Sequence, residues 1–513
     1  MDSIKGEKRL LRYTYFLCIV CFLNLAILKQ PFDKGAMIIA AVTCLLIGYS
    51  YFIIRKFFSD GDKYMFIFSS ILSVIGIVML YRIDVSTSIK QIIWFAIGVT
   101  VFILMVVLLP DLKRFDKYKY LFLIITILFM GLGTLFGKET YGAKNWVNIG
   151  GIAFQPSEFG KIFLVAYLAA SLKNYDGKFI KLIEPAVVVM MCLGFMVLQR
   201  DLGSALIFFG ISITMLYIAT SKLKYVLTCL GLFGAGSVIS YKLFDHVQTR
   251  VLIWKNPWPY ASGKSYQIVQ SMLSIASGGL SGTGLGLGHP EYVPVNTTDF
   301  IYAVICEELG ILMGFAIIIF YFLLFYRGMR AAVHAENNFS RLLAVGYSAM
   351  IASQVLVIVG GVINMIPLTG ITLPLVSRGG SSMMSIYICL GILQKISEEV
   401  DKIMKDISNN IKKVLLVFLI CFMGLITYIT YFEIVVGPKI VDSTYNRRLW
   451  VKRNEVLRGT IYDRNMKALT KSERVNSELQ NREYTGNSMF AHVLGYVNVK
   501  YGLTGLEKSM TRN

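Results

Sequence analysis

The chain has 513 residues, of which 55% are hydrophobic and only 16% charged, and its mean hydropathy is +0.61. A water-soluble protein of this length needs a far more polar surface, so the composition excludes that class and indicates an integral membrane protein. The formal net charge of +20 could suggest nucleic-acid binding. However, Lys and Arg gather in short links between apolar runs, as they do in the inner loops of membrane proteins. We therefore assign the charge to membrane topology and expect no nucleic-acid partner.

About thirteen apolar runs are long enough to cross a bilayer as helices, which takes roughly 20 residues each. In chain order they are residues 11–28, 35–54, 64–81, 91–109, 119–137, 156–172, 182–198, 202–219, 224–241, 299–326, 341–363, 380–394 and 414–436. The Lys-rich and Arg-rich links between them fall on one side, which predicts a cytoplasmic N-terminus and a tail outside the cell membrane. We expect an all-α polytopic bundle with a small extracytoplasmic α+β tail.

The predicted outer segment 242–298 is too long for a simple connection between two helices, and loops of this length are usually functional or structured. Within it, residues 278–288 hold six glycines. They lack the G-x-x-x-x-G-K-[ST] pattern of a nucleotide-binding loop. The glycines therefore predict a tight, close-packed turn.

Three acidic residues stand at the start of the predicted span 299–326. Asp299 follows Asn296, Thr297 and Thr298, a pattern that on its own favours a helix N-cap cluster. Glu307 and Glu308 follow about 12–14 Å further along the helix. Adjacent acids at membrane depth are costly, so they indicate either a functional site or buried ion pairs. The sequence leaves both interpretations open.

Other charged residues also lie at predicted outer ends of helices. Arg200 and Asp201 form either a charged turn beside small packing residues or a charge pair that faces an outer cavity. Glu158 at a helix start could cap first-turn amides, and Lys161 could pair with it at i, i+3. Arg378 lies in an irregular Gly-Ser loop, where a cation could hold a phosphate. Together these residues suit a charged, phosphate-bearing lipid substrate at one outer face.

Several motifs in order along residues 60–400 resemble the SEDS family, which includes FtsW and RodA. They are GAKNWVNIG at 142–150, QPSEFGK at 155–161, LQRDLGSA at 198–205, YQIVQSMLSIASGGLSGTGLGLG at 266–288, TDFIYAVICEELG at 298–310 and NMIPLTGITLPLVSRGGSS at 364–382. The chain departs from the family pattern where Val295 replaces a Glu, Arg378 replaces a Tyr and Arg200 replaces a Pro.

The tail is similar to the N-terminal pedestal of class B penicillin-binding proteins. The resemblance rests on Tyr445 to Arg447, RGTIYDRNMKAL at 458–469, FAHVLGYV at 490–497 and TGLEKS at 504–509. No Lys-Thr-Gly occurs, and the one Ser-x-x-Lys, from Ser221 to Lys224, is expected on the inner side. We therefore expect no transpeptidase activity from this chain.

The two resemblances imply a division of the chain into five parts. These are extra N-terminal membrane helices at 1–60, a glycosyltransferase-like membrane core at 61–400 with its large outer loop at 242–298, a linker and last membrane helix at 401–436, and a truncated pedestal-like segment at 437–513.

The SEDS resemblance implies a peptidoglycan glycosyltransferase that polymerises lipid II in the cell membrane, for elongation, division or sporulation. Asp299 would be the catalytic base, and a divalent cation, Mg²⁺ or Mn²⁺, could assist. Substrate-binding residues would be Lys144, Gln155, Glu158, Lys161, Arg200, Asp201, Arg250, Glu307, Arg378, Ser381 and Ser382. A class B penicillin-binding-protein transpeptidase is the implied partner. A lipid II flippase and a catalytically weak scaffold are the alternatives.

Overall fold

The structure is a computed structural model of the chain. It describes residues 2–58, 61–109, 111–140, 143–150, 152–398, 409–443, 445–448, 457–474, 480–485, 487–498 and 502–510. Residues 401–408 of the expected linker lie outside this description. So do residues 449–456, 475–479 and 511–513 of the expected tail.

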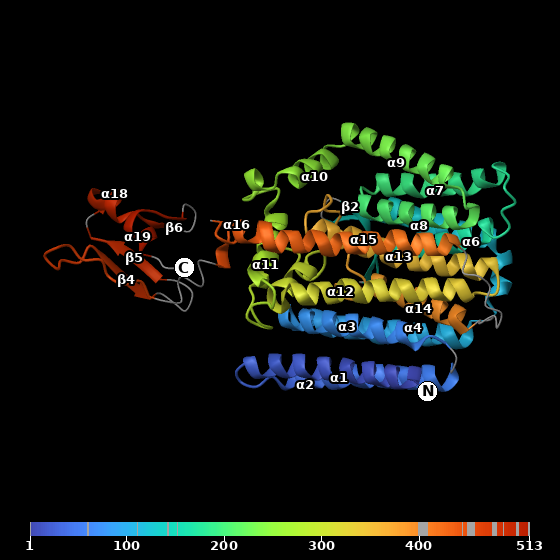
Figure 1. Cartoon of the computed structure of the whole chain (residues 1–513), viewed down its shortest axis with the longest axis horizontal. Helices are drawn as coiled ribbons and strands as arrows, with labels where there is room; N and C mark the ends of the chain where they lie inside the picture. Colours follow the sequence, from blue (N-terminus) through green and yellow to red (C-terminus); the bar gives the residue numbers. More distant parts are fainter. Residues whose placement is uncertain are drawn as a thin grey trace.

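Each apolar run that predicts a membrane span forms a helix, so the all-α bundle is confirmed (Figure 1). These helices are α1 (Asp2–Leu28), α2 (Lys34–Phe57), α3 (Lys63–Ile83), α4 (Val85–Leu108), α5 (Lys119–Phe136), α6 (Pro156–Leu172), α7 (Ile180–Leu198), α8 (Leu202–Thr220), α9 (Leu223–Leu243), α12 (Ile301–His334), α13 (Asn338–Val362), α14 (Gly380–Glu398) and α15 (Asn409–Tyr431). Among the described residues, 11 helices are long and apolar enough to cross a membrane; α6 and α14 are the two of this set that are not among them.

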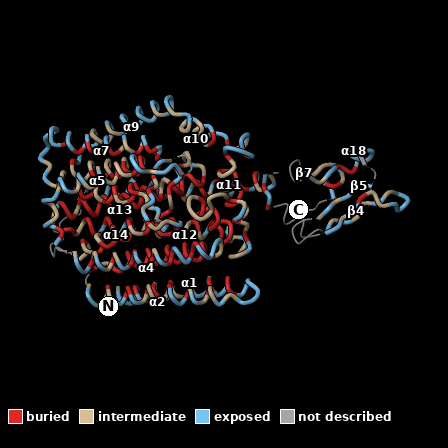
Figure 2. Tube along the Cα trace, turned by 180° about the vertical axis from the view of Figure 1, so that it is seen from behind, coloured by how far each residue is buried: buried red, intermediate tan, exposed pale blue. Residues whose placement is uncertain are grey.

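The helices differ strongly in how much of their surface is buried, as Figure 2 shows. α3 and α13 lie at the centre and are buried almost throughout, whereas α9 has no buried residue. The outer helices expose large apolar side chains such as Leu45, Leu135 and Leu232. An apolar outer surface suits lipid tails, and helices satisfy their own backbone polar groups there.

The N-terminal hairpin of α1 and α2 packs beside α3 and α4 and is fastened at both ends. At one end Arg55 lies 3.4 Å from the buried Glu7. At the other end Tyr81 of α3 donates a 2.8 Å hydrogen bond to Asp33. These contacts join the two extra helices to the bundle.

One end of the bundle, opposite the N-terminus in Figure 1, carries most of the additional structure. Strands β1 (Lys138–Thr140), β2 (Ala143–Ile149) and β3 (Ile152–Phe154) form an antiparallel sheet in the order β1-β2-β3. The segment 242–298 contains α10 (Asp245–Lys255), the 3₁₀ turn η2 (Trp258–Tyr260), α11 (Tyr266–Gly278) and η3 (Pro290–Tyr292). After α15 come the π-helical turn η4 (Phe432–Val436) and α16 (Gly437–Val441), while the 3₁₀ helix η1 (Leu112–Lys117) lies between α4 and α5.

The glycine-rich segment 278–288 packs directly on a kink in α12, which confirms the predicted tight turn. The kink is at Gly310, where φ is +78°. A Cβ at Gly310 would lie 2.3 Å from the carbonyl oxygen of Leu280. At Gly282, where φ is +84°, a Cβ would lie 2.3 Å from the carbonyl oxygen of Glu308. Only glycine permits this backbone approach.

The described part of the tail is a small α+β unit, as predicted. It contains strands β4 (Thr470–Arg474), β5 (Gln480–Tyr484), β6 (Val497–Asn498) and β7 (Gly502–Leu503), and helices η5 (Asn487–Phe490), α18 (Ala491–Leu494) and α19 (Gly505–Ser509). β4 pairs with β5, and β6 with β7, both antiparallel. The buried Glu507 joins the parts, because Arg458 at 3.0 Å and Arg482 at 2.8 Å both pair with its carboxylate.

Gly310→Ala should destabilise the fold. The new Cβ meets backbone atoms, and a non-glycine residue at positive φ costs about 1–3 kcal/mol on its own. The measurement is the midpoint of thermal unfolding of the detergent-solubilised protein. Gly236→Ala in α9 is the control, because nothing lies within 4 Å of a Cβ there. A Gly310→Ala midpoint equal to that of this control would contradict the close packing.

Candidate active site

Asp299 lies in the turn between the glycine-rich segment and α12. The N-cap of α12 is Phe300, so the N-cap interpretation of Asp299 is wrong. The Asp299 side chain is partly accessible and lies beside Gly370, where a Cβ would be 3.6 Å from Oδ2. Burial raises the pKa of Asp299 to about 6, and the Asp201 charge adds to this rise. A hydrogen bond from Thr298 and the charge of Arg250 act in the opposite direction.

Asp201 is the N-cap of α8 and is held by four hydrogen bonds. The Ser204 amide and hydroxyl donate to it at 2.9 and 2.8 Å. Asn145 Nδ2 from β2 donates at 2.7 Å, and Gln155 Nε2 donates at 3.1 Å. Four donors stabilise the ionised form of this buried carboxylate. Asp201 is therefore a fixed negative charge within the electrostatic reach of Asp299.

Arg250 brings a positive charge from α10 to the same place. Its Nη1 donates to the carbonyl oxygens of Leu368 and Thr369 at 3.1 and 3.3 Å, so α10 is tied to the loop between α13 and α14. The guanidinium charge interacts with both Asp201 and Asp299. A cation and two carboxylates thus converge from α8, α10 and the turn before α12.

The loop between α13 and α14 holds the backbone that carries Asp299. Ser377 Oγ donates to the carbonyl oxygen of Thr298 at 2.6 Å. The amide of Arg378 donates to the carbonyl oxygen of Thr297 at 2.8 Å. The Arg378 side chain itself is exposed, which leaves its charge available at the outer surface.

Strained backbone surrounds this cluster. Four non-glycine residues in the outer turns have φ between 55° and 66°: Arg200, Val295, Asn364 and Leu375. For β-branched Val295, four positions before Asp299, this conformation is a clear outlier. Strain of this kind persists where the surrounding contacts enforce it, and it gathers at functional sites.

Several buried polar atoms near these elements have no hydrogen-bond partner among the described residues. They are Asn145 Oδ1, Ser157 Oγ, Thr369 Oγ1 and Ser382 Oγ. Ser381 Oγ accepts a 3.4 Å hydrogen bond from the Gln155 amide. Buried polar groups are almost always satisfied, so these atoms indicate a place for water or for a polar ligand.

Glu158 and Lys161 form the predicted i, i+3 ion pair, with Lys161 Nζ 2.8 Å from Glu158 Oε1. Both are buried inside the bundle. Lys161 also donates to Gln354 of α13 at 3.0 Å, and Ser385 of α14 donates to Glu158 at 2.9 Å. Gln354 in turn donates to the carbonyl oxygen of Thr372 at 3.0 Å. The pair therefore supports the α13–α14 loop from behind.

Three other expected site residues lie elsewhere. Arg200 pairs with Glu139 at 3.8 Å, so the predicted Arg200–Asp201 charge pair is wrong. Lys144 is exposed, although its amide donates to the carbonyl oxygen of Gln199 at 2.9 Å. Glu307 pairs with Arg448 at 2.7 Å, which agrees with the buried ion-pair interpretation. Glu308 likewise pairs with Arg82 at 3.1 Å.

Asn145 is a site residue that the sequence interpretation missed. Lys144 and Asn145 are adjacent on β2, and successive side chains of a strand point to opposite faces. Lys144 therefore faces outward while Asn145 reaches Asp201. Identification of 143–149 as a strand would have separated the two.

The described residues do not bring together three His, Cys, Asp or Glu side chains in a group that could hold a metal ion. Their donor set does not fit a resident divalent cation, because Mg²⁺ needs several oxygen ligands. We assign no chemical step to a metal.

Comparisons with known proteins agree with this architecture. Residues 62–402 match the family model of FtsW, RodA and SpoVE, described as "Cell cycle protein", and residues 458–513 match the penicillin binding protein A dimerisation domain. Over 416 residues, 74% of this chain and 88% of the relative, the chain is 34% identical to peptidoglycan glycosyltransferase RodA of Mycobacterium tuberculosis strain H37Rv. It is 32% identical to stage V sporulation protein E of Bacillus subtilis, over 66% of this chain and 97% of that protein.

Two solved structures are similar in fold. One belongs to work described as the structural coordination of polymerization and crosslinking by a peptidoglycan synthase complex. It matches with a TM-score of 0.58 and 25% identity over 67% of this chain and 99% of the other. The other is Rod shape determining protein RodA of Thermus thermophilus, with a TM-score of 0.52 and 23% identity over the same shares of the two chains. The chain therefore belongs to the FtsW/RodA/SpoVE family.

Proposed function

We propose that this protein is a peptidoglycan glycosyltransferase that polymerises lipid II at the outer face of the cell membrane. The single observation that carries the proposal is Asp299, a partly accessible carboxylate with a raised pKa beside Arg250 and Asp201. The names of the RodA, FtsW and sporulation relatives support the reaction. The same activity would serve elongation, division or sporulation.

In the proposed reaction Asp299 is the general base. Its carboxylate takes the proton of the acceptor sugar 4-hydroxyl while that oxygen attacks the anomeric carbon of the donor. The bond between the anomeric carbon and the undecaprenyl pyrophosphate then breaks, and the electron pair leaves with the phosphate. A pKa of about 6 makes Asp299 a stronger base than an ordinary aspartate and leaves it ionised near neutral pH.

Negative charge develops on the departing pyrophosphate, and cations at the outer surface would stabilise it. Arg378 is exposed, and Arg200 is about half exposed, so both side chains are accessible to such a group. Ser381, Ser382 and Gln155 would supply hydrogen bonds in the same cavity. A divalent cation, Mg²⁺ or Mn²⁺, would enter only as a companion of the pyrophosphate.

The proposed orientation places the N-terminus in the cytoplasm and the tail outside. The Lys-rich and Arg-rich links support it through the positive-inside rule. A class B penicillin-binding-protein transpeptidase is the proposed partner, supported by the dimerisation-domain match at 458–513.

Asp299→Asn should abolish glycan synthesis, because the amide cannot accept the hydroxyl proton. The measurement is polymerisation of lipid II by the purified protein, with product glycans resolved on a gel, beside the wild type. Equal yield and thermal stability of the two proteins would show that folding is intact. Glycan synthesis retained by Asp299→Asn would rule out this base. If both proteins moved labelled lipid II across liposomes without making glycan, a flippase would be favoured. If the wild type did neither, even with a transpeptidase partner, the scaffold would remain.

Arg250→Met should shift the acidic limb of the pH–rate profile to higher pH. The base works only when ionised, so activity falls as pH drops through the Asp299 pKa, about 6 in the wild type. Arg250 lowers that pKa, and loss of its charge raises it. Initial rates of glycan synthesis between pH 5 and 8 test this, where about three units bracket the pKa. Arg330→Met, which removes an exposed charge at the far end of α12, should leave the limb in place. An unshifted limb for Arg250→Met would contradict the proposed electrostatics.

A further inference from the structure

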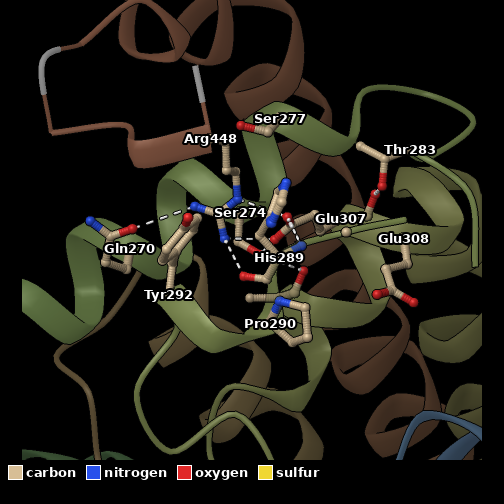
Figure 3. A network of polar contacts seen from close by, with 12 residues as sticks. Gln270, Ser274, Ser277, Thr283, His289, Pro290, Tyr292, Glu307, Glu308 and Arg448 are labelled. Carbon is tan, nitrogen blue, oxygen red and sulfur yellow. Dashed lines mark hydrogen bonds and ion pairs between the residues drawn. The ribbon is translucent and has the colours of Figure 1, made fainter. Parts of the chain in front are cut away.

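The segment that follows the last membrane helix is bound to the outer face through Arg448. Its Nε and Nη2 each lie 2.7 Å from one oxygen of the Glu307 carboxylate in α12, so the pair is bidentate. Arg448 is 7% exposed and Glu307 only 1%. Figure 3 shows the arginine reaching into the cluster from the segment after α16. Paired charge-assisted hydrogen bonds of this geometry are among the strongest in proteins.

The guanidinium also contacts α11 and the loop that leads to Asp299. Nη1 lies 3.4 Å from Gln270 Oε1, and Nη2 lies 3.5 Å from the carbonyl oxygen of His289. The guanidinium carbon lies 5.7 Å from the centre of the Tyr292 ring, within cation–π distance. The Arg448 side chain therefore joins α11, α12 and the 279–300 loop.

Glu307 holds the same loop with its remaining capacity. Its Oε1 accepts the His289 amide at 2.8 Å, and its Oε2 accepts the Ser274 hydroxyl at 2.5 Å. Glu308 points away from Arg448 in Figure 3 and accepts the Gly286 amide at 2.9 Å. The two adjacent acids thus fix two points of the glycine-rich loop, and the chain continues from there to Asp299.

Removal of the arginine would leave Glu307 as an uncompensated buried charge. Breaking a buried pair by losing one partner costs about 3–5 kcal/mol, because the remaining charge is neither hydrated nor neutralised. Glu307 would have to take up a proton or admit water, and either change weakens its hold on the His289 amide. Other contacts of the same segment are weaker, such as Asn446 Nδ2 to Ser277 Oγ at 3.4 Å.

We infer that Arg448 is a positioning residue for catalysis. By pairing with Glu307 it fixes the 279–300 loop and thereby the placement and burial of Asp299. The root of the tail then sets the turnover rate and leaves lipid II binding unchanged. This inference rests on the proposed function, in which Asp299 is the base.

The first experiment measures hydrogen–deuterium exchange of the full-length protein in nanodiscs, so that it does not depend on activity. Arg448→Met should increase exchange in peptides covering 283–289, where the Glu307 and Glu308 carboxylates hold backbone amides. Arg447→Met is the matched control, because this exposed neighbour loses the same charge. Unchanged exchange in Arg448→Met, or an equal increase in both variants, would overturn the inference.

The second experiment measures lipid II polymerisation by the same proteins. Arg448→Met should lower the maximal rate about tenfold or more, since small misplacements of a catalytic group cost up to about a hundredfold, with the half-saturating lipid II concentration unchanged. A more hydrated Asp299 should also move the acidic limb to lower pH. Loss of rate with an unmoved limb, or with raised exchange in all helices, would show a purely structural role.

A double variant separates loss of the pair from loss of one partner. Glu307→Gln keeps an oxygen for the His289 amide, so Glu307→Gln with Arg448→Met leaves no buried unpaired charge. It should recover much of the loop protection lost in Arg448→Met alone. Absence of recovery would contradict the mechanism. An inactive wild type would refute the proposed function, whereas the exchange measurements would still decide whether Arg448 holds the loop.

Discussion

Ionised side chains at membrane depth must be compensated locally, and this constraint organises the protein. Lys161 compensates Glu158, Arg448 compensates Glu307, and Arg82 compensates Glu308. Each pair also joins elements that are far apart in the sequence, so the charges position helices and loops as well as neutralise one another. Asp299 differs, because none of its contacts among the described residues is a direct ion pair. The acid without an adjacent cation is the one with a basicity suited to proton transfer.

The fold was largely predictable because run length alone reports a membrane helix. All the predicted spans are helices, and the glycine pattern correctly indicated a tight turn at 278–288. The outer elements were not predictable in this way. The short strands β1 to β3 and helix α10 are brief and polar, and no apolar run marks them.

The site was only partly predictable, because its contacts are set by tertiary packing. The i, i+3 spacing was sufficient to find the pair of Glu158 and Lys161. No local pattern could pair Glu307 with Arg448, which lies 141 residues away. Arg200 and Asp201 illustrate the opposite error. They are neighbours in sequence, yet one turns outward to Glu139 while the other caps α8.

The clamp at Glu307 has a further consequence, because its arginine belongs to the same chain as the membrane core. A contact supplied by a separate protein would depend on the concentration of that protein and on its dissociation rate. Here the linker through α15 and α16 keeps the arginine at a high effective concentration near its acid. Occupancy of the clamp is therefore insensitive to dilution in the membrane, and the ratio of core to clamp is fixed at one when the chain is synthesised.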